Sequence, residues 1–124
     1  MTSEIENWWK QSQEDIGTAE DNIKVKRYHA SSFYSQQAVE KALKALYIKK
    51  FGKLVKIHNI VFLAKKLELP SELIELCDKL NPVYIETRYP DASGKIPSYE
   101  YKKEDAESDL ENARKVLEWL KKMI

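Results

Sequence analysis

The chain has 124 residues, of which 43% are hydrophobic and 33% are charged, and its net charge is +1. This length and composition fit one domain with one hydrophobic core, and no apolar run is long enough to span a membrane. The acidic start lacks the apolar region of a secretion signal. We therefore expect one cytoplasmic domain over residues 1–124 that does not bind membranes.

The charge is unevenly distributed. Residues 24–66 carry eleven bases and one acid, whereas residues 1–23 carry six acids and one base. A basic segment of this kind favours a phosphate-bearing ligand or an acidic partner. The alternative is that acidic and basic helices neutralise each other across the fold.

The first predicted helix covers residues 4–24, where apolar residues recur every three or four positions. Ser3 and Glu6 have the spacing of a capping box at its start. The adjacent Trp8 and Trp9 differ by about 100° around a helix. We expect one of them in the core and the other at an interface, where Trp is enriched.

The second predicted helix, residues 30–51, has the strongest pattern and ends at Gly52. A broad apolar arc indicates a helix largely enclosed by others. Opposite the arc lies a polar stripe, which consists of Phe33, Gln37, Glu40, Lys41, Lys44 and Ile48. Because buried charges need partners, the stripe either contacts a ligand or forms a structural network or dimer seam bridged by Gln37. We favour the network.

The later segments are also helical. A short helix is predicted over residues 59–67, with Asn59 as its N-cap and His58 fixing its start through hydrogen bonds. Residues 72–86 form another, kinked or shortened by Pro82, and residues 103–123 form the last. Cys77 lies among leucines and is expected to be a buried thiol. The pattern predicts an all-α fold, an antiparallel up-and-down bundle of four to five helices.

Residues 87–101 form the one long irregular stretch, and a loop of this length in a small domain is commonly functional. It opens on Arg88, Tyr89, Pro90 and Asp91. In a cleft, Arg88 could bind a phosphate while Tyr89 stacks on a base. In the structural alternative, Arg88 pairs with Glu40 or Glu86 and fastens the loop to the bundle.

Common cofactor and metal motifs are absent from the sequence. The three isolated glycines form no phosphate-binding loop, and the two histidines and single cysteine are too far apart for a metal signature. We therefore expect no cofactor and no metal.

Residues 33–46, Phe-Tyr-Ser-Gln-Gln-Ala-Val-Glu-Lys-Ala-Leu-Lys-Ala-Leu, resemble the signature helix of HEPN domains (higher eukaryotes and prokaryotes nucleotide-binding). Other elements resemble the family in the same order: Trp8 with Ile16 and Ala19, then His58-Asn59-Ile60, then Tyr84 through Arg88-Tyr89-Pro90. The resemblance implies a helical bundle that is commonly a homodimer. Such domains are often encoded beside a minimal nucleotidyltransferase, with which they pair in toxin–antitoxin fashion, and some bind nucleotides.

The resemblance also implies a possible activity, because many members are metal-independent ribonucleases with an Arg followed four to six residues later by a His. Here no His follows Arg88, and Arg27 and His29 are only two positions apart. We therefore expect a binding module, a homodimer that pairs with a minimal nucleotidyltransferase, binds a nucleotide or RNA, or does both. The alternative is a ribonuclease with a degenerate active site.

The candidate ligand-binding residues are those of the polar cleft expected between the stripe and the loop. They are Gln37, Glu40, Lys41, Lys44, Arg88, Tyr89 and Asp91, with His58 as a minor, structural candidate. If the ligand lies elsewhere, the basic run Lys49, Lys50, Lys53 and Lys56 is the next candidate.

Overall fold

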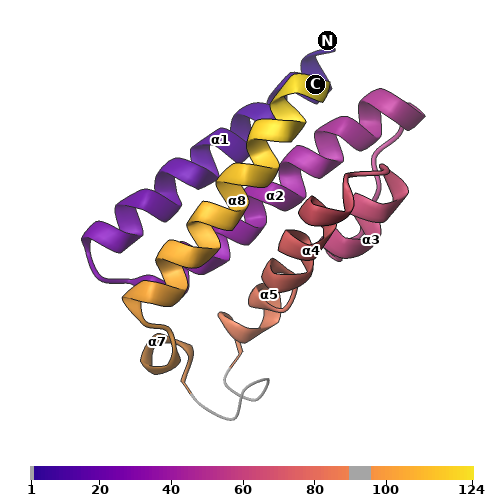
Figure 1. Ribbon diagram of the computed structural model, residues 1–124. Helices are drawn as coiled ribbons and strands as arrows, with labels where there is room; N and C mark the ends of the chain where they lie inside the picture. Colours follow the sequence, from indigo (N-terminus) through magenta and orange to yellow (C-terminus); the bar gives the residue numbers. More distant parts are fainter. Residues whose placement is uncertain (1, 90–95) are drawn as a thin grey trace.

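The computed structural model describes residues 2–89 and 96–124, and these residues form helices and no strand (Figure 1), which confirms the all-α prediction. Three long helices lie side by side: α1 (Ser3–Lys24), α2 (Tyr28–Phe51) and α8 (Lys103–Met123). Shorter helices pack on the other flank and at one end: α3 (Ile60–Lys66), α4 (Ser71–Leu80), α5 (Val83–Glu86) and α7 (Pro97–Glu100). No helix of the described residues is long and apolar enough to cross a membrane.

Helix α2 is the centre of the bundle, because it contacts each of α1, α3, α4, α5, α7 and α8. Five residues of its apolar arc are completely buried, namely Ala38, Val39, Ala42, Leu43 and Ala45. The distance between packed helices depends on the side chains at the contact, so the alanines allow close neighbours. The expectation of an enclosed second helix is confirmed.

The ends of the first two helices follow ordinary capping rules. Thr2, rather than Ser3, caps α1, since its Oγ1 accepts a hydrogen bond from the Ile5 N–H at 3.3 Å. The capping box expected from Ser3 and Glu6 is therefore wrong by one residue, because Ser3 already lies inside the helix. Helix α2 ends as expected at Gly52, whose φ of 73° lies in the left-handed region that favours glycine.

The helix predicted over residues 72–86 is divided into α4 and α5. Pro82 has no N–H to continue the hydrogen-bond ladder of α4, so the predicted interruption at this residue is confirmed. The side chain of Asn81, at the break, accepts a hydrogen bond from the Ile60 N–H at 3.1 Å. The interruption therefore also holds the first residue of α3.

The segment predicted to be irregular, residues 87–101, is not irregular throughout. Residues 97–100 form the single helical turn α7, and Pro97 occupies its first position, where a missing N–H costs little. Pro90 and Asp91 lie outside the described residues, so the candidate role of Asp91 stays a prediction.

The two adjacent tryptophans contact different surroundings. Trp9 packs against both apolar clusters of the core, whereas Trp8 packs only against the smaller one, formed by Ile5, Ala45 and Ile48. Trp9 is therefore the core residue of the pair. Trp8 remains the candidate for an interface.

Candidate functional site

The polar stripe of α2 contains two sets of charged contacts, of which the first joins α2 to α1. The Lys41 ammonium donates to the carboxylate of Asp15, a side chain that is 4% exposed. Gln11 donates a second hydrogen bond to Asp15 at 3.0 Å. Asp15 gave no signal in the sequence, because it is one of six acids within the first 23 residues.

The second set is centred on Glu40. One carboxylate oxygen, Oε2, lies 3.1 Å from Lys44 Nζ and 3.1 Å from His58 Nδ1. The Glu40 and Lys44 side chains are 4% and 6% exposed, so both charges are removed from water. Lys44 Nζ also lies 5.6 Å from the centroid of the Trp8 ring, within the range of a cation–π interaction. Glu40 and Lys44 thus belong to a polar network, as favoured from the sequence.

Gln37 does not take the bridging position expected for it. Its amide donates instead to the side-chain oxygen of the neighbouring Gln36 at 2.8 Å. Gln36 is completely buried, as are Ser31, Ser32 and Ser35 on the same helix. These buried polar residues escaped the sequence analysis because a helical wheel places them beside apolar residues.

His58 has the structural position proposed for it. Its contact with Glu40 joins the segment before α3 to the middle of α2. The next residue, Asn59, caps α3 as predicted, since its side chain accepts a hydrogen bond from the Phe62 N–H at 3.0 Å. The start of α3 is thereby fixed to α2 and to its own first turn.

Arg88 and Tyr89 follow α5 and are both exposed. The Arg88 guanidinium carbon lies 5.7 Å from the centroid of the Phe33 ring and 5.3 Å from that of Tyr89. Phe33 is the first residue of the polar stripe, so this segment reaches α2. Gln37 follows Phe33 by one helical turn, which places the two halves of the candidate site next to each other.

The two acids proposed as structural partners of Arg88 have other contacts. Glu40 binds Lys44 and His58, as described above, and Glu86 accepts a hydrogen bond from the Tyr101 hydroxyl at 3.4 Å. Arg88 also contacts the bundle at α2, where its guanidinium carbon lies 5.7 Å from the centroid of the Phe33 ring.

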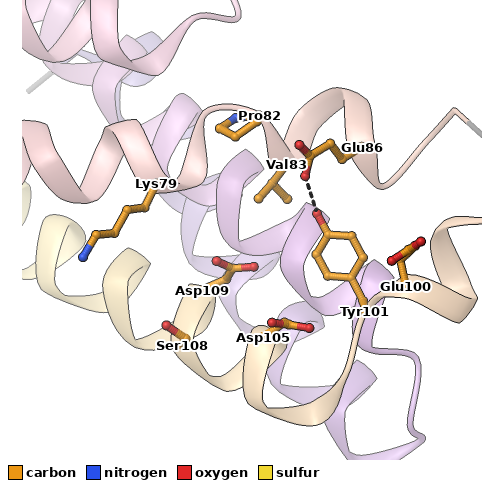
Figure 2. A pocket seen from close by; sticks show the side chains of 9 residues that line it. All are labelled: Lys79, Pro82, Val83, Glu86, Glu100, Tyr101, Asp105, Ser108 and Asp109. Atoms are coloured by element: carbon orange, nitrogen blue, oxygen red, sulfur yellow. Dashed lines mark hydrogen bonds between the residues drawn. The ribbon is translucent and has the colours of Figure 1, made fainter. Parts of the chain in front are cut away.

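A pocket of about 570 Å³ lies between α4, α5, α7 and α8 (Figure 2). Tyr101 reaches across it to Glu86, while Asp105 and Asp109 project from α8 toward the same space. Its lining residues are Lys79, Pro82, Val83, Glu86, Glu100, Tyr101, Asp105, Ser108 and Asp109. The sequence did not predict this pocket, because its residues are spread over thirty-one positions and converge only in the fold.

The acids in this pocket affect one another. The pKa of Asp109 is raised to about 6, mainly by burial. The Ser32 hydroxyl opposes this shift, and the charges of Asp105 and Glu86 contribute to it. Burial also raises the pKa of Tyr101, with the charges of Glu86 and Asp109 adding to the effect. The hydroxyl of Tyr101 is therefore protonated at neutral pH and donates to Glu86.

The described residues offer little conventional catalytic chemistry. Cys77 is completely buried, and burial raises the pKa of its thiol to about 12, so the thiolate is not formed at neutral pH. Within residues 2–89 and 96–124, no three His, Cys, Asp or Glu side chains are arranged to hold a metal ion.

These observations define an all-helical bundle domain whose central helix carries a partly buried polar stripe. The model of the HEPN domain matches residues 5–123. The chain therefore belongs to the HEPN domain family. It is 34% identical to a protein of Methanocaldococcus jannaschii that bears the name Putative toxin MJ1304, over 90% of this chain and 82% of that protein.

Solved structures of similar proteins share the fold. TT1696 from Thermus thermophilus superposes with a TM-score of 0.93 at 30% identity, covering 99% of this chain and 100% of the other. ST0689, described as an archaeal HEPN homologue, gives a TM-score of 0.83 at 29% identity, with 98% of both chains covered. The HEPN domain protein tm0613 of Thermotoga maritima, at 23% identity and a TM-score of 0.73 over 94% of this chain and 95% of that one, shares the fold.

The Glu40 network predicts a large effect of removing one charge. The Glu40→Gln variant leaves the Lys44 ammonium buried without an anion, so it should lose about 3–5 kcal/mol of unfolding free energy in urea denaturation. Glu107→Gln is the matched control, because its pair with Lys103 is exposed and should contribute less than about 1 kcal/mol. Equal effects of the two substitutions would show that the network does not stabilise the fold.

The raised pKa of Asp109 predicts a pH-dependent effect on stability. The folded state binds the Asp109 proton more tightly than the unfolded state does. Protonation of Asp109 therefore adds stability as the pH falls from about 6 toward 3.8, the ordinary pKa of an aspartate. Above pH 7 the ionised carboxylate is unfavourable. Asp109→Asn should therefore stabilise the protein there by about 1 kcal/mol, a value reduced by partial solvent screening.

The measurement is thermal or urea denaturation of wild type and variant between pH 5 and 8. The advantage of Asp109→Asn should shrink as the pH is lowered below about 6. Asp78→Asn, at an exposed position of α4, is the control and should show no such trend. An advantage that is constant with pH would contradict the assignment to Asp109 ionisation.

Proposed function

We propose that this chain is a small HEPN-type binding module that acts as a homodimer and pairs with a minimal nucleotidyltransferase in a toxin–antitoxin-like system. The observation that carries the proposal is the use of the polar stripe: Lys41 and Lys44 are paired with acids of the same chain. A stripe neutralised in this way stabilises the fold rather than a reaction intermediate. Family membership and the toxin name of the Methanocaldococcus relative support the toxin–antitoxin setting.

Large aromatic side chains that are only half-buried support the homodimer. Phe33 is the first residue of the polar stripe, and Trp8 packs near its other end, against Ile48; neither ring is completely buried. Aromatic residues of this kind are enriched in protein–protein interfaces. A second copy packed on this face would remove both rings from water.

A ribonuclease ranks second among the candidate functions. Metal-free RNA cleavage requires a proton acceptor near the 2′-hydroxyl and a cation near the phosphate. Arg88 can supply the cation, but the sequence contains no His after it. His58 is hydrogen-bonded to Glu40. The pKa of His29 is lowered, mainly by burial and to a smaller extent by the charge of Arg27. Tyr89 or Asp91 would have to act as the acceptor.

Nucleotide binding is the second part of the proposal, and its site is centred on Arg88. The guanidinium lies near the Phe33 and Tyr89 rings, and the exposed Tyr89 ring offers a surface on which a base can stack. The phosphate contact is proposed at Arg88, because its guanidinium lies beside the exposed Tyr89 ring on which the base would stack, with Gln37 one helical turn from Phe33.

The proposal requires a minimal nucleotidyltransferase gene beside that of this chain, and pairing is tested by co-expressing the two. We expect the two proteins to co-purify as one complex, and the chain alone to have the mass of a dimer by light scattering at tens of micromolar. An unrelated helical bundle of similar size is the control for non-specific retention. A monomer that leaves the nucleotidyltransferase in the unbound fraction, or a genome without such a neighbour, would contradict the proposal.

Nucleotide binding is tested by calorimetry with ATP. Arg88→Ala should weaken binding at least tenfold, because it removes the phosphate contact, and added salt should weaken wild-type binding further. Arg114→Ala is the control, since Arg114 pairs with Glu20 on a different face. Identical binding by wild type and Arg88→Ala would remove Arg88 from the site.

A further inference from the structure

A second surface lies at the end of the bundle where α2 and α8 both finish (Figure 1). Lys49 Nζ donates to the backbone carbonyls of Met123 and Ile124, both at 3.0 Å. Lys50 Nζ lies 3.5 Å from the Leu67 carbonyl, just after α3. These contacts bring the ends of α2, α3 and α8 together.

A pocket of about 420 Å³ lies between these three segments. Its apolar lining consists of Leu46, Leu67, Trp119 and Met123, and its polar lining of Lys49, Lys50 and Glu68. Leu46 and Leu67 are buried, whereas Met123 is 44% exposed. The pocket thus offers apolar walls beside the ammonium groups of Lys49 and Lys50 and the carboxylate of Glu68, whose Oε2 lies 3.9 Å from Lys50 Nζ.

The surroundings of the pocket are strongly basic. Residues 49–66 contain six lysines and no acid, and all six lysines are exposed. Lys66 Nζ lies 5.6 Å from the centroid of the Phe51 ring, which brings the charge of α3 to the end of α2. Phe51 and Leu54 add exposed apolar surface between the lysines.

We propose that this surface, the pocket together with Lys50, Lys53 and Lys66, docks a segment of a partner protein in which acidic residues flank a large apolar side chain. The apolar side chain enters the pocket while the acids pair with the lysines around it. An apolar centre with a polar rim is the usual arrangement of a protein interface. The inference rests on the proposed function, because it names the surface that holds a partner.

The same surface fits a nucleic acid less well. Binding of single strands depends on open aromatic faces on which bases stack. The Phe51 ring already has two neighbours. Its centroid lies 4.6 Å from that of Tyr47 and 5.6 Å from the Lys66 ammonium. Of the apolar wall residues, Trp119 is aromatic, whereas Leu46, Leu67 and Met123 offer no ring on which a base can stack. Lys49 is already bonded to two carbonyls. An acidic, apolar protein segment matches both the charge and the pocket.

The test is fluorescence anisotropy with a labelled ten-residue peptide in which a central Leu-Phe pair is flanked by glutamates. We expect saturable binding to wild type that weakens at least tenfold in the Lys50→Glu, Lys53→Glu double variant. Met123→Glu should also weaken binding, because it places a carboxylate in the pocket wall. A peptide with lysines in place of the glutamates should not bind.

The matched control is the Lys10→Glu, Lys26→Glu double variant, which makes the same change in net charge at exposed positions outside the pocket. It should bind the acidic peptide like wild type. No binding to wild type, or equal loss in both double variants, overturns the inference. The inference is also overturned, in favour of a nucleic acid, if wild type binds an oligouridylate but not the peptide and the Lys50→Glu, Lys53→Glu variant no longer binds the oligouridylate.

The nucleotidyltransferase complex separates this inference from the proposed function. If that complex forms with wild type and is lost in the Lys50→Glu, Lys53→Glu variant, both stand. If the complex forms equally well with the double variant, and the double variant also binds the peptide as tightly as wild type, the docking surface is wrong and the proposed function stands. If it does not form with wild type while the peptide still binds selectively, the proposed partner is wrong and the surface stands.

Discussion

A single buried carboxylate oxygen, Glu40 Oε2, organises the polar interior of this bundle. Lys44 approaches it from the same helix and His58 from the segment before α3. A carboxylate with so little access to water is stable only when it is paired. The sequence of α2 therefore requires α3 to start close to its middle. The pair of Lys41 with Asp15 places a corresponding requirement on α1.

These two requirements leave α2 with little exposed surface. Its apolar arc faces the core, and its stripe is used to attach α1 and α3. The exposed surfaces that remain for partners lie toward the two ends of α2, at Phe33 with Arg88 and at the lysines beyond Phe51. Helix α2, which has the strongest family signature, therefore contributes mainly to the architecture. The surfaces that we propose for recognition lie on the segments next to its two ends.

Much of the fold could be predicted from the sequence, because its determinants are local. Hydrophobic periodicity located the long helices, Gly52 and Pro82 marked two of their ends, and Asn59 marked a start. The site was less predictable, because its contacts are long-range. Nothing in the sequence connects Lys41 with Asp15, twenty-six positions earlier, or assembles the acids around Asp109. Helical periodicity likewise did not identify Gln36 as buried.

The side chain of Asn81 has a consequence for the dynamics of the molecule. By accepting the Ile60 N–H, it connects the first residue of α3 to the break between α4 and α5, so these three helices are held at one point. Helices α3 and α4 also pack directly on each other. Segments coupled in this way open cooperatively rather than one by one. The amide hydrogens of α3, α4 and α5 should therefore exchange as those of one unit.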